Sequence, residues 1–166
     1  KKDWATTGTA THEGRNVVNS LSLNAAQLEQ WNIDRYERYK IVEQNEVMYE
    51  EFMMDDADIC IVSFGIAARV SKNAIMMARE KGIKVGMIRP ITLWPFPKDA
   101  LNKAASKVKS FLSVELNMGQ MVDDVKLAIN CAKPVYFYGR TGGVIMTPDE
   151  VVNKLTEIEK GEAKQW

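Results

Sequence analysis

Four short apolar runs, each followed by a stretch with helical spacing, constrain the fold of this chain more than any other feature. The runs lie at residues 58–64, 84–89, 110–115 and 134–138. A short continuous apolar run is typical of a strand that is buried on both faces. Repeated strand–helix alternation predicts a mainly parallel sheet with right-handed crossovers and helices on both sides. We therefore expect a three-layer α/β/α domain.

The segments between and after these runs predict the helices. The first helix is expected to bury Ile66, Val70, Ala74, Met77 and Ala78. A short helix is expected from Pro97 to Ala105. The helix after the third run is expected to bury Met118, Met121, Val122, Val125, Ala128 and Ile129. The last helix begins at Thr147–Glu150, a capping box with proline at the first helical position.

The second apolar run leads directly into a loop that is rich in proline. Pro90, Pro95 and Pro97 each fix φ and lack an N–H donor, so a central strand cannot continue through them. Trp94 and Phe96 alternate with these prolines. Open α/β sheets carry their functional loops at the carboxyl ends of strands, which is where this segment begins. We expect a stiff, extended loop with two aromatic anchors.

The composition of the chain narrows the class of protein. Of 166 residues, 46% are hydrophobic, which is enough for a packed core. Lysine plus arginine and aspartate plus glutamate number 22 each, so the overall charge favours neither nucleic acid nor a membrane surface. No apolar run approaches the roughly 20 residues of a membrane span. The chain opens at Lys1 rather than methionine, and we expect a cytoplasmic piece of a longer protein.

The two cysteines, Cys60 and Cys131, lie far apart in apolar segments. We expect both to be buried free thiols in a reducing compartment. Neither belongs to a C-x-x-C array, so the sequence predicts no zinc or iron–sulfur site built from this chain alone.

Residues 1–54 differ from the rest and are expected to form a polar segment followed by a long helical arm. Within this segment, we expect a short edge strand at residues 6–11. We expect His12 to be a surface or interface histidine. Residues 24–54 contain neither glycine nor proline and predict the arm, capped by Ser22 or Asn24 and laid across another surface. The arm is followed by an acidic patch made of Asp55, Asp56 and Asp58. A metal site is conceivable there, but we favour a solvated helix end. The α/β domain is expected to span residues 55–166.

The candidate chemistry lies in the loops after the strands. Gly139–Gly143, with Arg140, has the composition of a phosphate cradle, but no dinucleotide fingerprint follows the first strand, which ends at Gly65. Glu115, near Asn117 and Gln120, suits a general acid or base. It suits equally a cap on the amide groups that open the next helix, and we favour the cap.

Four motifs together closely resemble the carboxyl-terminal domain of the α subunit of 2-oxoacid:ferredoxin oxidoreductases, a domain similar to the carboxyl-terminal domain of transketolase. The motifs are Phe64–Gly65, Lys84–Pro97, Val114–Met121 and Tyr138–Gly143. The upstream arm looks most like the branched-chain member, the oxidoreductase for 2-ketoisovalerate (3-methyl-2-oxobutanoate). By this analogy and the crossover rule, the four strands should have the order 2-1-3-4 in the sheet.

The resemblance implies oxidative decarboxylation of a 2-oxoacid on thiamine diphosphate and magnesium, with electrons passing through iron–sulfur clusters to ferredoxin and the acyl group to coenzyme A. The family carries these cofactors on other segments or subunits. We therefore expect this fragment to bind no cofactor and to be inactive alone. Its expected role is to hold the active-site domain against its neighbours and to line the coenzyme A approach.

The strand ends should bring one candidate docking and ligand-binding edge together. Its predicted residues are Gly65, Arg89, Trp94, Phe96, Glu115, Asn117, Gly119, Gln120, Arg140, Gly142 and Gly143. Trp94 and Phe96 are expected to be an exposed pair, because aromatic residues and arginine supply most interface energy. Two alternatives stay open: a nucleotide-binding module supported by Gly139–Gly143, and a pure assembly scaffold supported by the arm.

Overall fold

The structure, a computed structural model, describes residues 2, 4, 5 and 16–166. Its strands are β1 (Tyr49–Phe52), β2 (Ile59–Ser63), β3 (Val85–Pro90), β4 (Ser110–Glu115) and β5 (Val135–Gly139). Its helices are α1 (Ala25–Asn45), α2 (Gly65–Glu80), α3 (Lys98–Ala105), α4 (Met121–Ala128) and α5 (Pro148–Glu159). The strands form one sheet in the order β1-β3-β2-β4-β5.

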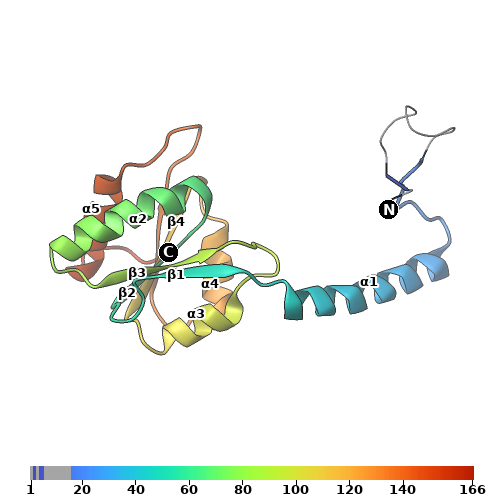
Figure 1. Cartoon of the computed structure of the whole chain (residues 1–166), viewed down its shortest axis with the longest axis horizontal. Helices are drawn as coiled ribbons and strands as arrows, with labels where there is room; N and C mark the ends of the chain where they lie inside the picture. The colour runs from blue at the N-terminus through green and yellow to red at the C-terminus, as the bar shows by residue number, and fades with distance from the viewer. Residues whose placement is uncertain (1, 3, 6–15) are drawn as a thin grey trace. The chain divides into compact units, whose positions relative to one another are not determined.

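The four predicted strands pair in parallel, and their order is the predicted one. β2 lies between β3 and β4, and β5 follows β4. One apolar cluster joins the sheet to α2 and α5, and a second cluster joins its other face to α3 and α4. Figure 1 shows these helix pairs on opposite sides of the sheet. The three-layer prediction is confirmed.

The predicted helical arm is wrong at its carboxyl end. α1 ends at Asn45, and residues 49–52 form β1, an edge strand antiparallel to β3. Backbone groups of Met48 extend this pairing, because its carbonyl accepts hydrogen bonds from the amides of Ile91 and Thr92 at 2.9 and 3.1 Å. The free edge of β3 thus overrides the helix propensity of Tyr-Glu-Glu-Phe. The edge strand suggested for residues 6–11 lies outside the described residues.

The turn between β1 and β2 is held tightly against β3. The guanidinium of Arg79 donates to the carbonyls of Val85 and Met53 at 2.7 and 2.8 Å and to the carboxylate of Asp56 at 2.7 Å. Met53 has a φ of 53°. A Cβ atom at Gly86 would lie 2.4 Å from the carbonyl oxygen of Met53, so only glycine fits beneath this turn.

The chain divides between Ile41 and Val42 into two compact units. In the first unit, the amide of Gln27 donates to the Asn24 side chain at 3.1 Å, so Asn24 caps α1 as one of the two predicted candidates. No residue of α1 is buried. No helix in the described part of the chain is long and apolar enough to cross a membrane.

Each of two predicted helix faces agrees with the structure except at one residue, Ile66 in the first and Met118 in the second. The residues that α2 buries are Ala67, Ala68, Ser71, Ala74, Ile75 and Ala78. Ile66 is 53% exposed because α2 begins at Gly65 and its first turn faces the carboxyl edge of the sheet. Met118 is 72% exposed because it lies in the loop before α4. The capping box of Thr147 and Glu150 is confirmed.

The prediction of two buried thiols is wrong for Cys131, which is exposed in the turn after α4, while Cys60 is buried in β2. Burial raises the pKa of the Cys60 thiol to about 12, so almost none of it is thiolate at neutral pH. Thiol labelling of the native chain near pH 8 should therefore modify Cys131 at least about 100-fold faster than Cys60. Cys131→Ser should remove the fast phase, and equal rates for both thiols would contradict this assignment.

Candidate functional site

The carboxyl ends of the parallel strands bring the predicted loops to one edge of the sheet. Gly65 opens α2 directly after β2 with a φ of 59°, a backbone conformation that favours glycine. Arg89 lies near the end of β3, Glu115 is the last residue of β4, and Arg140 follows β5. We call this surface the carboxyl edge.

Glu115 is buried, and both of its carboxylate oxygens are committed to the chain. Oε1 accepts hydrogen bonds from the Ser113 hydroxyl and the Val122 amide, both at 2.9 Å. Oε2 accepts from the amides of Gln120 and Met121 at 3.2 and 2.9 Å. A carboxylate at a helix N-terminus satisfies donors that have no intrahelical partner. The structure thus assigns Glu115 the role of a helix cap, the interpretation favoured from the sequence.

The loop after β4 is fixed by further close contacts. The Asn117 side chain accepts from the amide of Gly119 at 2.7 Å, and Gly119 has a φ of 102°. The Asn117 carbonyl oxygen would lie 2.4 Å from a Cβ atom at Gly139, so the loop rests directly on the end of β5. The Gln120 side chain is exposed beyond it. This loop therefore presents a rigid surface.

Arg89 belongs to a small charge network at the β1 side of the edge. The Glu50 carboxylate accepts from the Lys72 ammonium and, at 3.1 Å, from the Arg89 guanidinium. These two cations lower the pKa of Glu50, with the hydrogen bond from Lys72 contributing most. Beside them lies an open hollow of about 430 Å³, which is also lined by Gly65 and Arg69.

The arginine of the loop after β5 makes its contacts within the chain. The Arg140 amide donates to the carbonyl of Glu115 at 3.2 Å, and its guanidinium lies 3.6 Å from the Glu150 carboxylate. Gly142 and Gly143 have φ values of 67° and 86°, which explains glycine at both positions. The amide and the guanidinium of Arg140 thus both have partners within the chain.

The predicted aromatic pair is split by the structure. Trp94 is 53% exposed, but Phe96 is only 8% exposed and packs into the apolar cluster beneath α3. The Thr92 hydroxyl donates to the Pro95 carbonyl at 2.9 Å and holds the loop between them. Phe96 is therefore a core anchor for the loop, and Trp94 is its outward-facing aromatic residue.

Exposed apolar side chains surround the carboxyl edge, and most of them were missed from the sequence. We call this set the apolar rim: Ile66, Ile91, Leu93, Trp94, Leu116, Met118, Val144 and Ile145. Each of these residues follows the end of a parallel strand. The sequence did contain a signal, namely large apolar residues in the segments after all four predicted strands. A soluble surface seldom gathers such residues on neighbouring loops. Such a patch is typical of a protein–protein interface.

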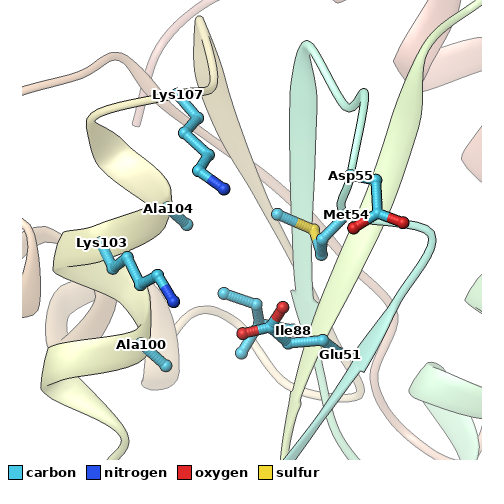
Figure 2. A pocket seen from close by; sticks show the side chains of 8 residues that line it. All are labelled: Glu51, Met54, Asp55, Ile88, Ala100, Lys103, Ala104 and Lys107. Carbon is cyan, nitrogen blue, oxygen red and sulfur yellow. The ribbon is translucent and has the colours of Figure 1, made fainter.

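A separate small pocket lies between α3 and β1, away from these loops. Lys103 of α3 and Lys107 of the turn after it extend toward the side where Glu51 and Asp55 lie (Figure 2). Its volume of about 40 Å³ suits ordered water, because substrate sites usually enclose about 300 Å³ or more. The described part of the chain contains no group of three or more His, Cys, Asp or Glu residues that could hold a metal ion.

Residues 57–151 match the family described as pyruvate:ferredoxin oxidoreductase core domain II. The ketoisovalerate oxidoreductase subunit VorB of Methanothermobacter marburgensis is 42% identical over 155 residues, which are 93% of this chain and 44% of that relative. The chain thus spans less than half the length of this relative.

Two solved structures share the fold. One is 2-oxoglutarate:ferredoxin oxidoreductase from Magnetococcus marinus with 2-oxoglutarate, coenzyme A and succinyl-CoA bound: TM-score 0.65, 21% identity, 92% of this chain and 28% of that chain covered. The other is a split-gene transketolase, an inactive beta4 tetramer: TM-score 0.56, 18% identity, 66% and 40% covered. The predicted transketolase-like fold is confirmed. With its match over residues 57–151, the chain belongs to the pyruvate:ferredoxin oxidoreductase core domain II family.

Proposed function

We propose that this chain is the assembly domain of a 2-oxoacid:ferredoxin oxidoreductase and docks through its carboxyl edge on the part of the enzyme that holds thiamine diphosphate. The observation that carries the proposal is the apolar rim, eight exposed large side chains in the first turn of α2 and on the loops after β3, β4 and β5. Burying such a surface against a partner is favourable by roughly 25 cal/mol for each Å² removed from water.

The polar groups of the same edge support docking more than catalysis. Both carboxylate oxygens of Glu115 accept hydrogen bonds from backbone amides. Arg89 forms an ion pair with Glu50, and Arg140 forms one with Glu150. A general acid or base needs a proton site that reaches the substrate, and Glu115 offers none. The described residues fit neither a magnesium–diphosphate site nor a cluster site, since none of their acidic, histidine and cysteine side chains gather in threes.

For the substrate, we propose a branched-chain 2-oxoacid such as 2-ketoisovalerate, with coenzyme A as acyl acceptor and ferredoxin as electron acceptor. The support is the match to the ketoisovalerate oxidoreductase subunit, which covers 93% of this chain and so extends well beyond the core domain II match at residues 57–151.

The docking proposal predicts that replacing Trp94 weakens subunit association, whereas replacing an exposed apolar residue outside the apolar rim does not. Trp94→Ala should weaken association with the rest of the oxidoreductase by on the order of 2 kcal/mol, about 30-fold in dissociation constant, because buried aromatic anchors dominate interfaces. The same substitution should lower the melting temperature of the isolated chain only slightly. Leu127, 73% exposed near the end of α4, provides the control, and Leu127→Ala should change neither quantity.

The measurements are subunit association by titration and thermal melting of the isolated chain, for both variants and the unmodified protein. Equal losses of stability and association for Trp94→Ala would make Trp94 a core residue and would remove the support for docking. Unchanged association would do the same.

A further inference from the structure

A groove beside the apolar rim combines apolar walls with an excess of negative charge. It encloses about 710 Å³ between the last turn of α1, the start of β1, the loop after β3, the first turn of α3 and Asp124 of α4. Tyr49, Leu93 and Trp94 line it and are 42%, 47% and 53% exposed. The volume is within the range of sites that hold several side chains or a small ligand.

Three carboxylates line this groove, those of Glu43, Asp99 and Asp124, against one ammonium, that of Lys98. Within residues 16–166, none of the three carboxylates takes part in a salt bridge. The groove thus carries two uncompensated negative charges beside an apolar surface.

The environment of Asp124 is unfavourable to its own negative charge. Partial burial raises the pKa of this carboxyl, and the neighbouring charges of Asp123 and Glu115 raise it further, while Lys98 lowers it by less. A positive charge placed in the groove would relieve this repulsion. A metal ion is a poor match, because no group of three or more potential ligand side chains that could hold one occurs in the described part of the chain. Long cationic side chains are the better match.

We propose that this groove receives a peptide segment from another part of the same oxidoreductase, in which arginine or lysine is flanked by apolar side chains. The inference rests on the proposed function and specifies one contact of the proposed interface. Three features support it: the excess of carboxylates, the apolar walls, and the shared residues Leu93 and Trp94 that join the groove to the apolar rim. More than half of the ketoisovalerate relative lies outside the segment that this chain matches, which leaves ample chain to supply the occupant.

The groove proposal predicts that neutralising its carboxylates weakens assembly without lowering the stability of the isolated chain. A variant with Glu43→Gln, Asp99→Asn and Asp124→Asn should bind the rest of the oxidoreductase at least about tenfold more weakly at about 50 mM salt. The loss should shrink at about 500 mM salt, because screening already weakens the charge attraction in the unmodified protein. The isolated variant should melt at the same temperature or slightly higher, since neutralising Asp124 removes repulsion from Asp123 and Glu115.

The matched control carries the same change of net charge outside the groove. Glu80, Glu159 and Glu162 are exposed, and Glu80→Gln, Glu159→Gln and Glu162→Gln together should alter association less than about twofold. If both triple variants weaken association equally, the effect is one of overall charge and the groove proposal is wrong. If the groove variant associates normally at low salt, the proposal is also wrong.

Photo-cross-linking in the assembled oxidoreductase identifies the occupant. A benzophenone side chain at position 93 should capture a peptide from elsewhere in the enzyme with arginine or lysine within about three residues of the linked site. Capture of a segment without a basic residue would overturn the proposal. A second probe at Ile145, on the apolar rim outside the groove, tests the docking proposal itself. A cross-link from Ile145 with no basic peptide at position 93 would leave the docking function standing and the groove proposal refuted.

Discussion

Replacing Glu115 with alanine should lower the free energy of unfolding of the chain by about 3–5 kcal/mol. The reason is that three amides at the start of α4 lose their acceptor, those of Gln120, Met121 and Val122. Hydrogen bonds to a charged group are worth about 1.5–3 kcal/mol each, and a buried donor left without a partner is costly. Urea denaturation of the isolated chain measures the loss.

Two milder variants should form a graded series with Glu115→Ala. Ser113→Ala removes only the hydroxyl that donates to Oε1 and should cost about 1 kcal/mol. Glu115→Gln keeps one oxygen acceptor but turns an NH2 group toward the amides, so its loss should lie between the other two. A Glu115→Ala chain with unchanged stability but impaired turnover in the assembled enzyme would show instead that Glu115 acts in catalysis.

Gly86→Ala should cost about 3 kcal/mol of stability, mainly by displacing the edge strand. The new Cβ atom would lie 2.4 Å from the Met53 carbonyl oxygen and 2.8 Å from its carbonyl carbon, and the backbone cannot yield as a flexible side chain does. The turn must then move away from β3, which disrupts the contacts that Arg79 makes with Met53 and Asp56. Amide hydrogen exchange should show lost protection in β1 while β2 and β4 stay protected.

Gly82→Ala is the control for this prediction. Gly82 has a φ of 85° but no atom within 4 Å of a built Cβ, so alanine there bears backbone strain alone, about 1–2 kcal/mol. It should leave the exchange protection of β1 unchanged. Equal exchange behaviour in the two variants would mean that close approach at Gly86 is not what holds the edge strand.

The sequence determined the parallel part of the fold because its signals are local. A buried parallel strand must be apolar on both faces, and runs such as Val85–Ile88 meet that requirement without reference to the rest of the chain. Crossover handedness then leaves few strand orders. The cap role of Glu115 was also predictable, because a carboxylate just before a helix meets unpaired amides. The capping box that begins α5 depends on four adjacent residues.

Only the tertiary structure decided the features that depend on residues distant in the chain. Tyr49–Phe52 forms a strand because β3, nearly 40 residues later, offers an unpaired edge, and the helix propensity of the segment is too weak to resist. Phe96 is buried in the cluster under α3 and Trp94 is exposed, which the alternation of the two rings with prolines does not distinguish. The groove with Glu43, Asp99 and Asp124 joins three segments, and its charge follows from their packing. Long-range pairing and burial thus built the proposed docking surface, whereas local pattern determined the sheet that supports it.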